Sequence, residues 1–326
     1  MRVAIIGCGL IGQKRLRLLG RDHQLIVAVD SIRERAQALA GQRPGADATA
    51  DWREAVSRSN VDAVLVATTN RWLAPIALAA IQSGKHVLVE KPAARNSAEL
   101  QPLVTAAAAR KVCVQVGFNH RYHPAFRKAR EIFESGALGP LMFIRGRYGH
   151  GGRLGYEREW RADPEISGGG ELLDQGVHLI DLAGWFLGPF VHVEGYAPTY
   201  FWDMPVEDNG FLMLRTAADQ VALLHASCTE WKNLFSFEIY GRNAKLHIEG
   251  LGGSYGLERL CFYRMLPQMG PPETTIWEYP QEDLSWRHEL EAFFGFIERG
   301  ESPRPGLPEA VAALKIVEEI YRKTGS

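Results

Sequence analysis

The chain opens with a short apolar run, a glycine-rich turn and a helical segment, and this succession restricts the possible folds more than any other feature. The run "RVAIIG" is rich in β-branched residues, which is typical of a buried parallel strand. It leads into Gly7-Cys8-Gly9-Leu10-Ile11-Gly12, which fits G-x-G-x-x-G, and then into "LIGQKRLRLLG", which has helical spacing. A strand, this turn and a helix together predict a dinucleotide-binding unit.

The three glycines have separate physical tasks in such a turn. Gly7 permits the tight turn, Gly9 lets the backbone approach a pyrophosphate, and Gly12 lets the helix pack closely on the strand. The helix N-terminus offers backbone N–H groups and a partial positive charge to the phosphates. We therefore predict cofactor contacts from the glycines and from the first helical residues, Leu10 and Ile11.

A second strand, "HQLIVAVD", ends in an acidic residue that indicates which dinucleotide is bound. Asp30 stands 18 positions after Gly12, where an acid that holds the adenosine ribose hydroxyls is expected. The alternative interpretation is that Asp30 caps the next helix. A carboxylate repels a 2′-phosphate, so NAD is the predicted cofactor. Arg33 and Arg35 lie close by in the sequence and leave NADP open.

Strands and helices continue to alternate with short links up to Asn119. The next strand-like runs are "VDAVLVAT", "KHVLVE" and "VCVQVG", and the helical runs between them are "RWLAPIALAAIQSG" and "SAELQPLVTAAAARK". This alternation predicts an α/β domain with a doubly wound parallel sheet of the Rossmann type, spanning residues 1–119.

The pattern changes after residue 119. One helical run, "HPAFRKAREIFESG", and a second over 168–182 lead into mostly strand-like runs: "FVHVEGYAPTYF", "NGFLMLRT", "QVALLHASCT", "FSFEIYG", "AKLHIEG" and "RLCFYRM". Helices near 284–299 and 307–323 close the chain, and the last is expected to pack back on the first domain. These runs predict an α+β domain over residues 120–326 with a mostly antiparallel sheet.

Length and charge agree with this two-domain organisation. A chain of 326 residues exceeds what one ordinary core supports. With 37 basic and 38 acidic residues, it gives no reason to expect nucleic acid or a membrane surface as a partner. Its cysteines, Cys8, Cys113, Cys228 and Cys261, are scattered without a C-x-x-C pair. They predict reduced thiols in a cytoplasmic protein.

The stretch "GGGELLDQGVHLIDL" carries ionisable residues in an apolar helical run. Asp174 and His178 are four residues apart and so on one face of a helix, with Asp181 one turn further. They could form a satisfied structural pair. They could bind a metal, although no further clustered ligand supports this, and we predict no metal. The functional interpretation is acid–base chemistry, in which His178 titrates near neutral pH and Asp174 stays ionised near the helix start.

Three motifs now stand in order: G-x-G-x-x-G, "GKHVLVEKP" at 84–92 and "GGGELLDQGVHLIDL" at 168–182. Together they resemble the glucose–fructose oxidoreductase / inositol dehydrogenase / rhizopine catabolism (Gfo/Idh/MocA) family of NAD(P)-dependent oxidoreductases. The resemblance covers essentially the whole chain. It implies a Rossmann domain, an open-faced sheet domain, and a sugar, inositol or related polyol bound between them.

The resemblance also implies a Lys–Asp–His set around the nicotinamide, which maps onto Lys91, Asp174 and His178. Hydride transfer from a secondary alcohol leaves a proton for His178 to accept, while Lys91 polarises the reacting oxygen. Asp174 would hold a substrate hydroxyl or orient the imidazole. Glu90 of the E-K-P motif is expected beside the cofactor, and a cis bond is expected before Pro92.

Other positions match the family pattern less fully. The segment "GFNHRYHP" suggests that Asn119 and Arg121 reach the site, and "EWRADPEISGGG" places Trp160 and Arg161 beside the cofactor. After the fourth strand the family has A-T-P-N-x-x-H. This chain keeps Thr68 and Asn70 as expected cofactor contacts, but it has Thr69 in place of the proline and Leu73 in place of the histidine.

The predicted function is therefore an NAD(P)-dependent dehydrogenase or reductase acting on a sugar, inositol or sugar derivative. Two alternatives stay open: an NAD-dependent glycosidase of the same family, and a cofactor-binding regulator without chemistry. A basic segment before the predicted catalytic helix allows a phosphorylated or nucleotide-linked sugar, although glutamates interleave with its arginines: Arg145, Arg147, Arg153, Arg158 and Arg161. An exposed apolar sheet face in the second domain predicts a homodimer or homotetramer.

Overall fold

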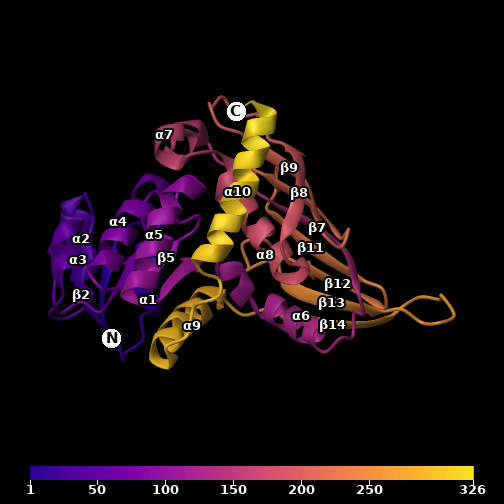
Figure 1. Cartoon of the computed structure of the whole chain (residues 1–326), viewed down its shortest axis with the longest axis horizontal. Helices are drawn as coiled ribbons and strands as arrows, with labels where there is room; N and C mark the ends of the chain where they lie inside the picture. The colour runs from indigo at the N-terminus through magenta and orange to yellow at the C-terminus, as the bar shows by residue number, and fades with distance from the viewer. Residues whose placement is uncertain (326) are drawn as a thin grey trace. The chain divides into compact units, whose positions relative to one another are not determined.

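The computed structural model describes residues 1–325, and these divide into two compact units (Figure 1). The first unit contains Met1–Phe118, Glu165–Gly168 and Trp286–Leu314. The second contains Asn119–Pro164, Gly169–Ser285 and the chain from Lys315 on. Segments 165–168 and 286–314, which follow residue 119 in the sequence, thus belong to the first unit.

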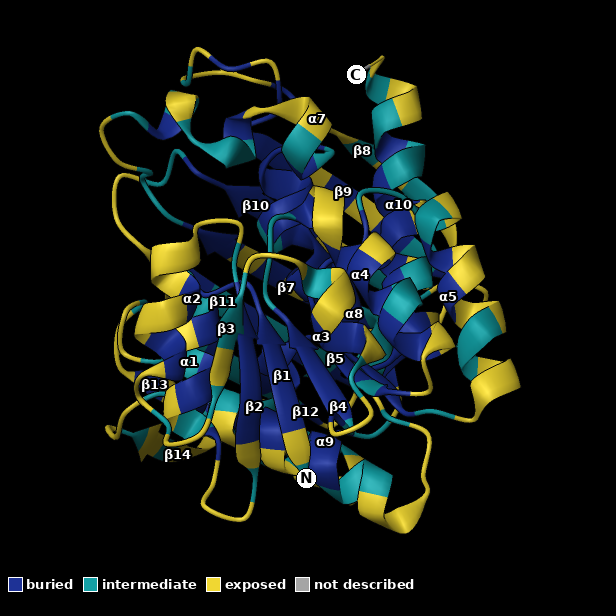
Figure 2. Ribbon diagram, turned by 90° about the vertical axis from the view of Figure 1, so that its left-hand side faces the viewer, coloured by how far each residue is buried: buried dark blue, intermediate teal, exposed yellow. Residues whose placement is uncertain are grey.

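The first unit is built on a six-stranded parallel sheet within the described residues. Its strand order is β3 (Asp47–Thr49), β2 (Gln24–Val29), β1 (Arg2–Ile6), β4 (Ala63–Val66), β5 (His86–Glu90) and β6 (Val114–Gly117). The central strands are almost wholly buried (Figure 2). The order reverses between β1 and β4, and this reversal is where ligands bind in doubly wound sheets.

Helices alternate with these strands and complete the first unit. They are α1 (Leu10–Leu18), α2 (Arg33–Ala40), α3 (Trp52–Ser57), α4 (Asn70–Gln82), α5 (Ser97–Arg110), most of α7 (Pro164–Ser167), α9 (Ser285–Arg299) and the start of α10 (Leu307–Thr324). Phe293 and Phe294 of α9 share one hydrophobic cluster with Ile5 of β1 and Leu16 of α1. A helix from the end of the chain therefore completes the first core. The short β3 and α3 carry no apolar run that predicts them.

The second unit is built on an eight-stranded mixed sheet, as far as the described chain extends. Its order is β14 (Glu273–Tyr279), β13 (Glu258–Arg264), β12 (Ala244–Glu249), β11 (Leu234–Gly241), β7 (Leu141–Gly149), β10 (Val221–Ser227), β9 (Asn209–Thr216) and β8 (Phe190–Tyr196). All neighbours are antiparallel except β7 and β10, which are parallel. The predicted fold class, a parallel Rossmann sheet followed by a mostly antiparallel one, is confirmed.

Two strands of this sheet are additional to those predicted, and one is shorter. β7 alternates buried residues with the exposed Arg145 and Arg147, which made it look like a charged segment before a helix. β14 is exposed at nearly every position and has no apolar run. β8 ends at Tyr196, two residues before Pro198, because proline has no N–H to donate to a sheet.

Helices cover one face of the second sheet (Figure 1). α6 (Pro124–Glu134) contacts β12, β13 and β14, whereas α8 (Val177–Leu187) and the π-helical turn η4 (Leu172–Gly176) contact β7 and β10. Three short 3-10 turns complete the unit: η1 (Asn119–Tyr122), η2 (Tyr156–Arg158) and η3 (Trp160–Ala162). Gly146 of β7 permits the close approach of α8, because a Cβ there would lie 3.2 Å from a methyl group of Leu179.

The segment 168–182 is not the single α-helix that its spacing predicts. The α-helix begins at Val177, and residues Leu172–Gly176 form a wider π-helical turn. The chain before the turn is held by distant contacts: a Cβ on Gly170 would lie 1.9 Å from the carbonyl oxygen of Glu207. The prediction that Asp174 and His178 lie one turn apart on a single regular α-helix is therefore wrong.

Two further properties concern the described chain as a whole. The four cysteines are free thiols, and all are buried. Within residues 1–325, no helix combines the length and the apolar character that a membrane crossing requires.

Candidate active site

The glycine loop, residues 7–12, has the geometry that its three glycines predict. Gly7 adopts φ +96°, and a Cβ there would lie 2.3 Å from the carbonyl oxygen of Ala67 at the end of β4. A Cβ on Gly12 would lie 1.9 Å from the carbonyl oxygen of Gly7. Around Gly9, by contrast, a Cβ would have no atom of the described chain within 4 Å apart from those of Gly9 and its two chain neighbours. The backbone at Gly9 is therefore open to a ligand, as a pyrophosphate requires.

The start of α1 supports the same interpretation. The helix begins at Leu10 with Gly9 as its N-cap, and within the described chain no side chain caps it. Leu10 and Ile11 thus lie in the first turn, where backbone N–H groups point out of the helix. Such a helix start binds anionic groups such as phosphate. The residues present fit a dinucleotide.

Asp30 lies against the glycine loop. Its Oδ2 accepts a hydrogen bond from the backbone N–H of Cys8 at 2.8 Å, and its Oδ1 accepts one from the N–H of Ile32 at 2.9 Å. Ile32 is the N-cap of α2. The carboxylate thus stabilises the turn before α2 and also stands at the loop where an acid for the ribose is expected. The two interpretations of Asp30 are compatible.

The segment after β4 explains the departures from the family pattern. Thr69 is the N-cap of α4, and Leu73 is fully buried in the first core rather than presented as a polar group. Asn70 donates from Nδ2 to the carbonyl oxygen of Ser167 at 2.8 Å. The Thr68 hydroxyl donates to the carbonyl oxygen of Thr69 at 3.2 Å.

Glu90 belongs to a buried ionic cluster. Nη2 of Arg15 lies 2.5 Å from Oε1 of Glu90 and 2.5 Å from Oε2 of Glu289, and the Arg15 side chain is 1% exposed. Burial by itself lowers the pKa of Arg15, but the two carboxylates outweigh this and raise it. Arg15 of α1 thus joins Glu289 of α9 to Glu90 at the end of β5. Lys91 follows at that end, and the Lys91–Pro92 bond is cis, as predicted.

Asp174 is paired with an arginine that precedes it in the sequence. Arg161 Nε donates to Asp174 Oδ2 at 2.9 Å, and Glu159 lies 3.8 Å from the same guanidinium. The Arg161 guanidinium also lies 4.5 Å from the ring centre of Trp160. Burial lowers the pKa of Arg161, and Asp174 then raises it above its ordinary value. Of the two predicted cofactor contacts, Arg161 therefore binds the carboxylate of the third motif, and Trp160 packs on the Arg161 guanidinium.

His178 is buried on α8 and packs against aromatic rings. Its ring is stacked on that of His120, with centroids 3.7 Å apart and planes inclined by 24°. Tyr148 of β7 lies edge-on, with its centroid 6.3 Å from that of His178. No motif indicated His120 or Tyr148. The alternation along β7 offers one signal, because it places Tyr148 on the opposite face of the sheet from Arg147.

Arg121 and Asp181 form a buried ion pair. Arg121 Nε and Nη2 donate to the two oxygens of Asp181 at 2.8 and 2.6 Å, and their side chains are 8% and 1% exposed. Asp181 is thus held in place by Arg121. The suggestion that Arg121 reaches the site stays a prediction. Asn119 beside it donates from Nδ2 to the hydroxyl of Ser285 at 2.9 Å.

Glu207, which the sequence did not indicate, fixes the entrance to η4. It accepts hydrogen bonds from the N–H groups of Gly170 and Leu172 at 2.9 and 3.0 Å and from the Tyr321 hydroxyl at 2.7 Å. Burial raises the pKa of Glu207, and these donors oppose the shift without cancelling it. The backbone that carries Asp174 is thus anchored by side chains far away in sequence.

Tyr255, which contacts Tyr148, was also not indicated by the sequence. Tyr148 and Tyr255 are hydrogen-bonded through their hydroxyls, with ring centroids 5.0 Å apart. Burial raises the pKa of Tyr148 well above its ordinary range, so this phenol stays neutral. Over residues 1–325, no group of three or more His, Cys, Asp or Glu side chains is placed to hold a metal ion.

Comparison with known families identifies the class. The model of the oxidoreductase family with an NAD-binding Rossmann fold matches residues 1–118, and that of the Gfo/Idh/MocA C-terminal domain matches residues 126–247. The chain belongs to the Gfo/Idh/MocA family of oxidoreductases, and its first unit is an NAD-binding Rossmann domain. The predicted family and cofactor class are confirmed.

Curated relatives cover part of the chain. Levoglucosan dehydrogenase of Pseudarthrobacter phenanthrenivorans is 33% identical over 174 residues, which are 50% of this chain and 43% of that protein. Inositol 2-dehydrogenase 3 of Saccharopolyspora erythraea is 37% identical over 147 residues, which are 44% of this chain and 43% of that protein. The chain thus spans about half the length of the curated relatives it matches.

Solved structures match the fold over the whole chain. A levoglucosan dehydrogenase in complex with NADH and levoglucosan has a TM-score of 0.88 at 24% identity, covering 100% of this chain and 97% of that one. An aldose–aldose oxidoreductase from Caulobacter crescentus, complexed with glycerol, has a TM-score of 0.85 at 22% identity, with the same coverage. At these identities the likeness concerns the fold.

Proposed function

We propose that this chain is an NAD-dependent dehydrogenase that acts on a secondary alcohol of a sugar or cyclitol. The observation that carries the proposal is that all three reactive positions of the family motifs are occupied, by Lys91, Asp174 and His178, in a chain of this family. Two relatives named levoglucosan dehydrogenase and inositol 2-dehydrogenase support the substrate class.

The roles follow from the chemistry of alcohol oxidation. Bound NAD supplies the hydride acceptor. Loss of hydride from the alcohol carbon leaves a proton on oxygen, which we assign to His178 because imidazole titrates near neutral pH. Asp174, which accepts a hydrogen bond from Arg161 Nε at 2.9 Å, is assigned to a substrate hydroxyl or to the orientation of the imidazole. Lys91 polarises the reacting oxygen; this rests on its motif and on its place at the C-terminal end of β5.

Cofactor contacts from the remaining predicted residues belong to the same proposal. They are Gly7, Gly9, Leu10, Ile11, Gly12, Asp30, Thr68, Asn70, Glu90, Lys91, Asn119, Trp160 and Arg161. Within this set, Asp30 favours NAD over NADP, because a carboxylate accepts hydrogen bonds from a ribose diol and repels a 2′-phosphate. Asp30→Ala should weaken NAD binding and narrow the preference, as measured by titrating both cofactors.

The arginines of the basic segment favour a substrate without phosphate. Arg145 and Arg147 lie on the face of the sheet opposite Tyr148, so they point away from His178. Arg153 is paired with Glu159 at 2.7 Å. Arg158 lies 3.5 Å from Glu157, and Arg161, which is in the proposed site, is bound to Asp174 at 2.9 Å. A neutral sugar, anhydrosugar or cyclitol therefore fits the site better than a sugar phosphate.

The test is a screen of the purified chain with NAD and with NADP. Free sugars, anhydrosugars, inositols, sugar phosphates and nucleotide sugars are each supplied, and reduced cofactor is followed by its absorbance. We expect turnover with NAD and a neutral polyol or sugar. Release of sugar from glycosides without net reduction of NAD would instead identify a glycosidase, and cofactor binding with no turnover would identify a regulator.

Lys91→Ala tests the assignment of the E-K-P motif. Because Lys91 acts on charge that develops during the reaction, the variant should fold and bind NAD while kcat/KM falls roughly 10²-fold or more. A collapse of the melting temperature would show that Lys91 is structural and that the mapping is wrong.

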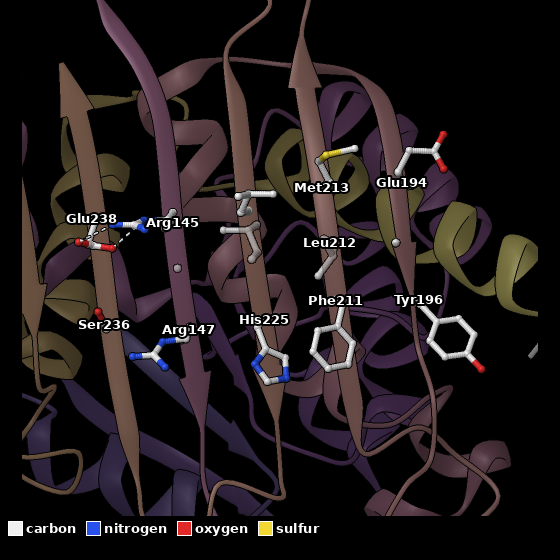
Figure 3. A pocket seen from close by; sticks show the side chains of 14 residues that line it. Arg145, Arg147, Glu194, Tyr196, Phe211, Leu212, Met213, His225, Ser236 and Glu238 are labelled. Carbon is white, nitrogen blue, oxygen red and sulfur yellow. Dashed lines mark hydrogen bonds and ion pairs between the residues drawn. The ribbon is translucent and has the colours of Figure 1, made fainter. Parts of the chain in front are cut away.

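We further propose that the second sheet joins two or more copies of this chain. Its face opposite α8 holds a pocket of about 630 Å³ (Figure 3). Exposed apolar side chains, among them Phe211 and Met213, lie there beside both acidic and basic groups, such as Glu194 and Arg147. In an isologous dimer such a face meets its own copy, so that apolar areas pack together and acidic groups can meet basic ones. Sedimentation analysis of wild type and Met213→Glu tests this; a monomeric wild type would refute it.

A further inference from the structure

One face of the His178 ring is covered by another histidine. The centroids of His120 and His178 are 3.7 Å apart, and their planes are inclined by only 24°. The two residues are 5% and 3% exposed. His120 comes from η1, which follows β6, whereas His178 is on α8. The reactive ring proposed here is thus held flat against a side chain from a different element.

His120 is itself enclosed and cannot turn freely. The ring of Tyr148 lies tilted at 5.1 Å between centroids, that of Phe235 at 6.0 Å, and that of His123 edge-on at 5.6 Å. His123 is anchored in turn by Glu258, whose Oε2 lies 2.9 Å from Nδ1. The plane of His120 is therefore fixed by rings on several sides, and a fixed plane can align a second ring stacked on it.

We propose that His120 is a positioning residue for the proton acceptor: its ring fixes the plane in which His178 meets the substrate hydroxyl. The inference rests on the proposed function, in which His178 takes the proton. Proton transfer needs donor and acceptor aligned within hydrogen-bond reach. A misplacement of about 1 Å at a reacting group can cost roughly 10²-fold in rate. A ring that tilts freely about its χ2 bond would lose part of this alignment.

The experiment distinguishes the effect of a planar ring at position 120 from the effect of the histidine side chain as such. His120→Phe keeps a planar ring, whereas His120→Leu keeps similar bulk without one. We expect His120→Leu to lower kcat about 10- to 100-fold, while KM and the NAD affinity change about twofold or less. His120→Phe should restore kcat to within about threefold of wild type. If His120→Leu does not fold, His120→Gln replaces it as the variant without an aromatic ring.

Controls distinguish this inference from the proposed function. His192→Leu alters an exposed histidine on β8 and should leave every parameter unchanged. Both His120 variants should keep the dependence of rate on pH, because His178 is still the base. Equal kcat in wild type and His120→Leu would overturn the inference, and so would equal losses in His120→Leu and His120→Phe. If His178→Asn retained the rate, the proposed function itself would fail, whatever the His120 variants do.

Discussion

The glycine loop and the segment from Gly170 to Leu182 are held in opposite ways. The loop is packed tightly against backbone atoms, since a Cβ on Gly7 would overlap the carbonyl oxygen of Ala67 and a Cβ on Gly12 would overlap that of Gly7. The 170–182 segment is fixed by side chains from distant parts of the second unit, through Arg121, Arg161 and Glu207. The conformation of the glycine loop depends on which of its positions lack a side chain. The conformation of the 170–182 segment depends on partner side chains, and mutation can remove each of these separately.

This difference separates the expected effects of mutation. Changes in the loop should alter cofactor binding, and whether they also alter folding depends on the space at each glycine. Changes around the 170–182 segment, at residues outside the proposed cofactor contacts, should alter rate or stability while leaving NAD binding intact. Four predictions test this division, beginning with the largest expected effect.

His178→Asn should cause the largest loss. Asparagine has similar bulk and can hydrogen-bond, but it cannot take the proton, so the rate should fall roughly 10²–10⁴-fold. The rise of the oxidation rate with pH through one ionisation should also disappear. NAD affinity and the melting temperature should stay close to wild type. A pH–rate profile that kept both its height and its step would mean that the base lies elsewhere.

Arg121→Met should produce the next largest effect, on stability. The variant leaves the Asp181 carboxylate buried without its partner, which costs about 3–5 kcal/mol in the free energy of unfolding. Denaturant titration measures this cost. The double variant Arg121→Met, Asp181→Leu should recover much of it, because no unpaired charge remains. The kcat of the folded fraction should change little; a large fall in kcat at normal stability would place Arg121 in the reaction.

These two residues also show where sequence reasoning stops. The strands and helices of the first unit follow from local apolar runs and turn residues, and Gly7, Gly9 and Gly12 were interpretable because their tasks are local. Arg121 and Asp181 are 60 positions apart, so no spacing rule links them. The π-helical turn likewise depends on contacts to Glu207 from another part of the chain. Tertiary partners of this kind have no local signature.

Gly9→Ala and Gly12→Ala form a matched pair within the glycine loop. A Cβ at Gly12 meets the backbone of Gly7 at 1.9 Å, so that variant should lower both the melting temperature and NAD affinity. At Gly9 no described atom of the protein is within 4 Å, so the variant should fold like wild type. Its NAD affinity should still fall roughly tenfold, which corresponds to about 1.4 kcal/mol. Unchanged NAD affinity in Gly9→Ala would show that the cofactor does not approach there.

The smallest expected effect concerns acid stability in the second unit. Burial lowers the pKa of His150; Asp174 raises it, while Arg161 and Arg153 lower it again. His150 Nδ1 accepts the N–H of Gly152 at 2.9 Å, and its Nε2 lies 3.6 Å from Glu171. The folded state thus holds a neutral ring, whereas the unfolded chain takes up a proton as the pH falls below about 6.5. The contribution of the neutral His150 ring to stability is therefore full above about pH 6.5. It is lost as the pH falls from about 6.5 through the lower pKa of His150 in the folded state.

His150→Asn tests this by removing the titrating ring while keeping an acceptor for the Gly152 N–H. The fall in melting temperature between about pH 7.5 and about pH 5.5 should become smaller by a few degrees at most, in line with one partly buried group. It should not vanish, because burial also lowers the pKa values of His23, His86, His225 and His247. His192→Asn, at an exposed position of β8, is the matched control and should keep the full fall. If His150→Asn kept the full fall in melting temperature as well, His150 would not contribute to the acid sensitivity. Side-chain contacts around His150 would then stabilise this part of the second unit less than the ion pairs there suggest.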